Sequence, residues 1–515
     1  MVDQLSIFDL MYDKYKITKP IRLIELFSGY GSQALALKYL GVNFTHWRIC
    51  EWATKSIQAY NDLHIRDYTD YSKDLTADAI VERLAALGIS MDYNKPMTLE
   101  QIKRKGEAWQ RHTYNNIKAT HNLVDIAKAK AKDLNIIDTD KYEYILTYSF
   151  PCQDLSLAGA GKGMSKDSGT RSGLLWQVER ILSQLDELPQ VLVMENVPQI
   201  NSPKNKSDFR LWQQRLEELG YTNNIKVLNA KNYCIPQHRA RCFMVSVLGN
   251  QHFNYAKEMK LTNNLSTLLE HNVDTSYIIS NDKIKTLIKP LETEDIVLKQ
   301  VAQLKNNFDS IGRVYAIDGL APTLNTCGGG QREPKILIKE ATKKGYAEAH
   351  EGDSINLEQP NSKTRRGRIG KGVAQTLLTN CNQAVVINTN NKRLIKLIKN
   401  TQFNKNDTLF LDAYNQTTNN KMAGTITTRV DASNATFIYN DLIIRKLTPK
   451  ECWRLMGVKD ADYSNVAVNQ SKSSLYHLAG DSIVTTVLMA IFGELLGLDY
   501  ETKIAELVEE LKECG

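Results

Sequence analysis

Residues 21 to 40 of the chain read IRLIELFSGYGSQALALKYL. Ile21–Leu26 has the apolar alternation of a β-strand, and the glycines of Phe27–Gly31 then break the pattern. Gln33–Leu40 resumes with the periodicity of a helix. A strand, a glycine turn and a helix in this order predict an α/β fold.

Two further apolar runs predict more strands of the same sheet. They are residues 142–148 (YEYILTY) and 190–194 (QVLVM), and the segment between them is helical around 174–185. Because helices between strands allow parallel pairing, residues 1–245 are expected to form a doubly wound, mostly parallel, Rossmann-like sheet. Residues 441–515 return to this α/β character.

The composition is that of a globular chain with room for two or three domains. It has 515 residues, of which 42% are hydrophobic and 24% charged. The most apolar stretch, 483–498, contains Thr485, Thr486 and Glu494, so we expect a buried helix and no membrane segment. Residues 1–20 lack a long apolar run, so a cytoplasmic location is expected.

Charge and cysteine usage narrow the classes of partner and cofactor. The net charge of +7 permits a polyanionic partner without requiring one. The eight cysteines form no C-x-x-C pair, so neither a disulfide framework nor a zinc site is predicted, and no metal is expected.

Residues 77–135 form a lysine-rich helical insertion within the first domain. Lys103-Arg104-Lys105 begins a series of basic residues that continues to Lys132. A solvated helical face and a surface for the DNA backbone are both consistent with this pattern.

A second, β-rich domain is predicted over residues 246–440, where a pattern Ala-x-Thr-[Leu/Ile]-x-Thr occurs at 321–326, 374–379 and 423–428. An apolar run follows each copy, at 336–338, 384–387 and 435–438, which predicts three hairpin-like units. Their polar tips include Arg332 and Arg366, side chains of the type that reads base edges.

The glycine turn is a candidate cofactor site. Gly29 and Gly31 would let the backbone approach a ligand at the carboxyl end of the first strand. Glu51 follows a probable second strand, where an acid can accept hydrogen bonds from ribose hydroxyls. The pattern favours a nucleoside cofactor over a chance turn.

Three other segments carry candidate catalytic residues at strand ends. Cys152 follows the strand 142–148 and is either a core thiol or a nucleophile, and the polar segment 153–171 favours the nucleophile. Glu195 ends the strand at 190–194 and is either a helix cap or an acid. Arg239 and Arg241 would point the same way from an extended segment and could bind a carbonyl or a phosphate.

Together these motifs resemble, in order from Phe27 to Ile483, those of the DNA (cytosine-5)-methyltransferases, which have a class I S-adenosylmethionine-dependent fold. The run around Cys152 is especially similar to a bacterial CpG methyltransferase. The C-terminal motif commonly reads Gly-Asn-Ser in the family, so Asp481 is a departure. The resemblance implies S-adenosyl-L-methionine as the cofactor and 246–440 as a target-recognition domain.

The resemblance also implies roles for individual residues. The implied cofactor contacts are Phe27, Gly29, Gly31, Glu51, Trp52, Asp74, Leu75, Pro151, Leu175, Asp481 and Ser482. The implied DNA contacts are Gln153, Gln237, Arg332 and Arg366.

The family's chemistry fits the residue types. Cytosine C5 is a poor nucleophile until a thiolate, here that of Cys152, adds at C6. A protonated Glu195 would donate to N3, Arg241 would bind O2, and Arg239 would steady the site. The target cytosine should be flipped out of the duplex. Ala158 is too small to replace it by hydrogen bonding, so Leu157 or the second domain would fill the gap.

The expected substrate is double-stranded DNA, methylated by a monomer, with any cognate restriction endonuclease acting separately. An RNA cytosine-5-methyltransferase and a catalytically silent DNA-binding protein are the alternatives. An N-methyltransferase is disfavoured, because Ser149-Phe150-Pro151-Cys152 differs from the motif that would hold an exocyclic amine.

Overall fold

The structure, a computed structural model, describes residues 14–151, 154–155, 163–166, 170–263, 265–268, 270 and 448–513, and the strands β8 to β16 between 300 and 439. The chain divides into two compact units. The first comprises Met1–Leu268, Thr323–Gly328 and Pro449–Gly515, and the second comprises Leu269–Pro322 and Gly329–Thr448.

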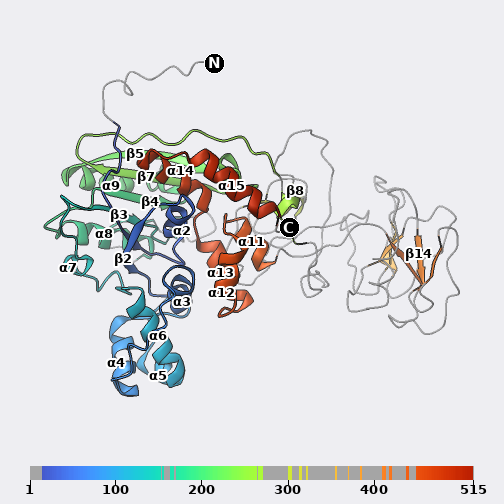
Figure 1. The fold of residues 1–515 in the computed structure, drawn as a ribbon, viewed down its shortest axis with the longest axis horizontal. Helices are drawn as coiled ribbons and strands as arrows, with labels where there is room; N and C mark the ends of the chain where they lie inside the picture. The colour runs from blue at the N-terminus through green and yellow to red at the C-terminus, as the bar shows by residue number, and fades with distance from the viewer. Residues whose placement is uncertain are drawn as a thin grey trace, which may run out of the picture. The chain divides into compact units, whose positions relative to one another are not determined.

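A six-stranded sheet of order β2-β1-β3-β4-β7-β5 organises the first unit (Figure 1). Its strands are β1 (Ile21–Leu26), β2 (Phe44–Cys50), β3 (Glu143–Tyr148), β4 (Val191–Asn196), β5 (Tyr221–Asn229) and β7 (Ala240–Leu248). β2, β1, β3 and β4 pair in parallel, whereas β7 is antiparallel to both β4 and β5. The predicted doubly wound, mostly parallel sheet is confirmed, as are its strands at 21–26, 142–148 and 190–194.

Both faces of the central strands of this sheet are buried. On one face, alternate strand residues such as Ile24 and Leu146 share a core with Trp176 of α8 (Leu175–Leu182) and Trp212 of α9 (Lys206–Glu218). The strand residues of opposite parity, such as Ile145, are equally buried, as expected for a sheet covered by helices on both sides.

The C-terminal segment forms α11 (Pro449–Arg454), α12 (Asp460–Ala467), α13 (Lys472–Asp481), α14 (Thr485–Leu496) and α15 (Tyr500–Glu513). α14 packs against α2 (Ser32–Tyr39) and α15. Among the described residues, Lys472–Leu496 is apolar and long enough to cross a membrane, but 89% of its most apolar window is buried within the protein. This is the pattern of a core helix, as the sequence predicted for 483–498.

The segment 77–135 contains α4 (Ala77–Leu87), α5 (Leu99–Lys103), α6 (Glu107–Ala119) and α7 (Ala131–Leu134) (Figure 1). Thr76 caps α4, and a capping box at Thr98 and Gln101 begins α5. The apolar faces of α4, α5 and α6 form their own core, which includes Leu84, Ile102 and Ile117, whereas Leu134 of α7 belongs to the core of the sheet. Ile57 of α3 (Thr54–Tyr60) joins this core and so fixes the insertion to the sheet domain.

The described strands of the second unit are antiparallel. β11 (Ser354–Asn356) lies between β12 (Ile369–Gly370) and β13 (Gln383–Val385), and β14 (Leu409–Asp412) lies between β15 (Thr417–Asn419) and β16 (Thr436–Tyr439). A hairpin pairs β8 (Gln300–Gln303) with β9 (Arg313–Tyr315). The apolar runs at 384–387 and 435–438 overlap β13 and β16, whereas 336–338, Arg332 and Arg366 lie outside the described residues.

Gly31 is required by packing beneath the first turn of α2. Its φ is 85°, and an added Cβ would lie 2.6 Å from both Tyr60 Cε2 and His64 Nε2. Gly41 has a similar φ of 75° but no atom within 4 Å of an added Cβ. A side chain at Gly41 would therefore suffer backbone strain alone, whereas a side chain at Gly31 would also overlap its neighbours.

Gly31→Ala is expected to destabilise the protein by about 2–4 kcal/mol, and Gly41→Ala by about 1 kcal/mol, because only the first adds a clash to the cost of a left-handed conformation. Chemical denaturation monitored by circular dichroism would measure both. Equal losses in the two variants would contradict the role given to Tyr60 and His64.

Candidate functional site

A cavity of about 430 Å³ lies at the carboxyl ends of the parallel strands. Its lining includes residues that follow four successive strands: Phe27 and Gly29 after β1, Glu51 and Trp52 after β2, Ser149 and Pro151 after β3, and Glu195 and Asn196 at the end of β4. This is the edge at which open α/β sheets bind ligands, and the volume is within the range of about 300–1,000 Å³ usual for small-molecule pockets.

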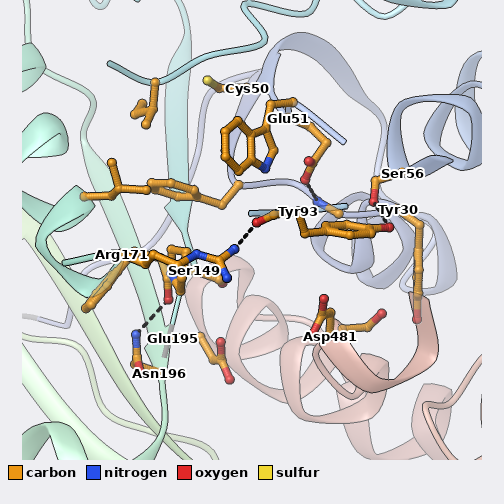
Figure 2. Close-up of a pocket in the computed structure, with 18 of the residues that line it drawn as sticks. Tyr30, Cys50, Glu51, Ser56, Tyr93, Ser149, Arg171, Glu195, Asn196 and Asp481 are labelled. Carbon is orange, nitrogen blue, oxygen red and sulfur yellow. Dashed lines mark hydrogen bonds between the residues drawn. The ribbon is translucent and has the colours of Figure 1, made fainter. Parts of the chain in front are cut away.

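Glu51 is held by backbone donors at one end of the cavity. Its Oε2 accepts a hydrogen bond from Gly29 N at 2.9 Å, and its Oε1 accepts one from Ala53 N at 2.8 Å. Burial raises the pKa of Glu51 to about 7, against the opposing effect of these hydrogen bonds. Figure 2 shows this carboxyl group and those of Glu195 and Asp481 around the same cavity.

Glu195 and Arg241 form the second charged group of the cavity. Arg241 Nε lies 3.0 Å from Glu195 Oε1, because β7 runs antiparallel beside β4 and brings its first residues to the end of β4. Burial raises the pKa of Glu195, although Arg241 and Arg239 act in the opposite direction. A raised pKa favours the protonated carboxyl, which can donate a hydrogen bond.

Arg239 is 4% exposed and lines the same cavity. Its Nη2 donates to the carbonyl oxygens of Gly480 at 3.0 Å and Ser482 at 2.6 Å. Arg239 therefore fixes the turn after α13, which places Asp481 and Ser482 on the cavity wall.

Cys152 and Gln153 lie outside the described residues, as do Leu157 and Ala158. Pro151 and Asp154, which flank Cys152 in the chain, are both held by hydrogen bonds from residues 171–172. Pro151 lines the cavity, and its carbonyl oxygen accepts a hydrogen bond from Ser172 Oγ at 2.7 Å. Asp154 Oδ2 accepts one from Arg171 N at 2.8 Å.

The structure brings most of the predicted cofactor residues to the cavity, but not all. Those on its wall are Phe27, Gly29, Glu51, Trp52, Pro151, Asp481 and Ser482. Gly31 faces Tyr60 instead, and Leu175, at 0% exposure, belongs to the core of the sheet while Leu174 lines the cavity.

The prediction for Asp74 and Leu75 needs correction. Asp74 is exposed and Leu75 packs on the core of the insertion, so neither lines the cavity. Asp125 and Ile126 lie on the wall in their place. The signal that could have found them is the literal Asp-Ile pair after the apolar residues at 123–124.

Asn122 explains the position of this second Asp-Ile segment. It forms a parallel bridge with Ile49 of β2, and its amide group pairs with the backbone of Glu51. Its Oδ1 accepts from Glu51 N at 3.0 Å, and its Nδ2 donates to Glu51 O at 2.9 Å. The segment that follows Asn122 is thereby held beside the ribose-binding candidate.

The prediction that Gln237 contacts DNA is contradicted. Its side chain is 0% exposed, and its Nε2 donates to the carbonyl oxygen of Leu455 at 2.7 Å. Gln237 therefore links β6 (Gln237–His238) to the C-terminal segment. Sequence reasoning also missed Tyr93, Asn94 and His477, which line the cavity.

Comparisons with known proteins point to one family of enzymes. The family model for C-5 cytosine-specific DNA methylase matches residues 100–497. The orphan methyltransferase M.SssI of Spiroplasma monobiae is 34% identical over 332 residues, which cover 63% of this chain and 83% of that protein. The type II methyltransferase M2.ScrFI of Lactococcus lactis is 27% identical, with coverage of 92% and 99%, and the orphan methyltransferase M.SPBetaI of Bacillus phage SPbeta is 25% identical, with coverage of 74% and 88%.

The family match covers most of the chain, and its range contains the positions of Cys152, Glu195, Arg239 and Arg241. The chain therefore belongs to the C-5 cytosine-specific DNA methylases, enzymes that transfer a methyl group from S-adenosylmethionine to carbon 5 of cytosine in DNA.

Proposed function

We propose that this enzyme methylates a flipped cytosine within a specific double-stranded DNA sequence through a covalent bond between Cys152 and C6 of the base. The observation that carries the proposal is the Glu195–Arg241 pair, whose side chains are 12% and 16% exposed and lie 3.0 Å apart in the cavity that Pro151 also lines. Pro151 immediately precedes Cys152 in the chain, so the acid and the cation line the same cavity as the residue next to the candidate nucleophile.

The cavity fits S-adenosylmethionine in its donors and acceptors. The Glu51 carboxylate can accept hydrogen bonds from the two ribose hydroxyls. Asp125 can accept a hydrogen bond from the exocyclic amine of adenine, and Ile126 can pack against the ring. Gly29 leaves space for the methionine portion, since an added Cβ there would have no atom within 4 Å. The bound cofactor supplies an electrophilic methyl group.

The protein's own groups account for the remaining steps. The Cys152 thiolate forms a bond to C6, and the electrons of the C5–C6 double bond become available for C5 to bond to the methyl carbon. Glu195 donates its proton to N3 and Arg241 binds O2, so charge that develops on the ring is stabilised. A base then takes the C5 proton, the thiolate leaves C6 as the C5–C6 double bond re-forms, and N3 returns its proton to Glu195.

We assign target recognition to residues 246–440. The described strands of the second unit form short antiparallel pairs, and Arg332 and Arg366 belong to polar segments between them. Amide and guanidinium groups on such segments are suited to reading base edges in the major groove. Bisulfite sequencing of mixed-sequence DNA after incubation with the enzyme and S-adenosylmethionine is expected to show protected cytosines in one short context.

Cys152→Ala is expected to abolish covalent capture of DNA that contains 5-fluorocytosine. The wild-type enzyme should form an adduct that survives denaturing electrophoresis, because fluorine at C5 cannot leave as a proton does. Cys234→Ala, at a buried cysteine outside the cavity lining, is the matched control and should still form the adduct. An adduct with Cys152→Ala would refute the assignment of the nucleophile.

Glu195→Gln is expected to lower kcat by about 10²- to 10⁴-fold, because the amide cannot deliver a proton to N3. The dissociation constant for S-adenosylmethionine should change little, since the cofactor contacts are assigned to other residues. Glu218→Gln, at an exposed acid on α9, is the control and should leave both values unchanged. Methyl transfer from labelled cofactor would measure kcat.

The affinity for S-adenosylmethionine is expected to increase about tenfold between pH 6 and pH 8. Since Glu51 has a pKa of about 7, it is mostly protonated at pH 6 and must ionise to accept both ribose hydroxyls. Glu51→Gln should bind more weakly and lose this pH dependence. Calorimetric titration at each pH would test this, and an equal dependence in Glu51→Gln would assign the titration to another group.

A further inference from the structure

The insertion contributes one wall of the cofactor cavity. Tyr93 and Asn94 lie between α4 and α5, and both line the cavity. Tyr93 has a φ of 61°, in the left-handed region that an aromatic residue rarely adopts. A strained backbone conformation of this kind persists only where surrounding contacts hold it. Such conformations are common at ligand-binding sites.

The Tyr93 ring is held from two sides. It stacks on the ring of His477 in α13, with centroids 3.9 Å apart and planes inclined by 14°. Its hydroxyl lies 3.3 Å from Ser56 Oγ in α3. His477 Nδ1 is in turn 3.1 Å from Asp481 Oδ2, so the stack reaches the C-terminal cofactor motif.

Arg171 connects the same wall to the chain around the nucleophile. Its Nη1 donates to Asn94 Oδ1 at 3.0 Å, and its Nη2 donates to the Tyr93 carbonyl oxygen (Figure 2). Its backbone N donates to Asp154, two residues beyond Cys152. Arg171 thus contacts the insertion through its guanidinium and the segment that carries Cys152 through its backbone N–H.

We propose that Tyr93 and His477 form a clasp on the cofactor cavity, and that Arg171 couples this clasp to the segment that carries Cys152. The second part of this proposal, the coupling through Arg171, rests on the role proposed above for Cys152. Tyr93 is a positioning residue: it retains the cofactor by holding the insertion against α13. The clasp gives the lysine-rich insertion a function at the cofactor site, whatever its exposed surface does.

Tyr93→Ala is expected to raise the dissociation rate and the KM of S-adenosylmethionine by about three- to tenfold, the range expected for loss of an aromatic stack, with a smaller change in kcat. Tyr93→Phe keeps the ring and should retain most of the affinity. Lys95→Ala, a neighbour outside the cavity lining, is the matched control. Stopped-flow measurement of tryptophan fluorescence would follow the cofactor directly, since Trp52 lines the cavity.

A double-mutant cycle separates the stack from general damage. Tyr93→Ala and His477→Ala should each weaken cofactor binding, and the double variant should be little worse than either. Additive losses, or a dissociation rate for Tyr93→Ala equal to that of Lys95→Ala, would overturn the clasp. Melting temperatures of all variants identify any that fail to fold, and if Tyr93→Ala is among them, His477→Ala still tests the stack.

The coupling is tested by Arg171→Ala in the same fluorescence assay. If Arg171 acts through the clasp, its loss should accelerate cofactor dissociation, and adding Tyr93→Ala should have less than the additive effect. Independent effects would overturn the coupling. Because binding is measured without DNA, an enzyme that binds cofactor but forms no Cys152 adduct would refute the proposed function and leave the clasp standing.

Discussion

The contact between Arg239 and the turn after α13 is the constraint on which the cavity depends. A buried guanidinium needs acceptors, and the carbonyl oxygens of Gly480 and Ser482 provide them at the carboxyl end of a helix, where a cation is favoured. This contact joins the start of β7 to a segment far along the chain. It holds the end of α13, and with it Asp481, beside the strand ends.

Two acids with little exposure at the same sheet edge have different surroundings and therefore different chemistry. Backbone N–H groups hold Glu51 as an acceptor, although burial brings its pKa to about 7. Glu195 instead faces Arg241, and burial raises its pKa as well. The first acid is suited to accept hydrogen bonds from a ribose, and the second to donate a proton to a base.

The strands and the order of the motifs could be predicted because both are local properties. β1 is Ile21–Leu26 as expected, and Glu51 and Glu195 lie where strand ends predict them. Asp125 was not predicted, because the strand before it is only a single bridge, completed by the side chain of Asn122. The hydrophobic periodicity of a sequence does not indicate a contact between a side chain and a distant backbone segment.

The sequence by itself determined the α/β class, the family motifs and the residue types that methyl transfer to cytosine requires. Only the tertiary structure decided which residues meet. Gln237 is buried against Leu455, and Tyr93 stacks on His477, because packing brings together segments that are distant along the chain. A local pattern reflects the geometry of its own strand or helix, whereas a cavity wall is formed by neighbours that the pattern does not contain.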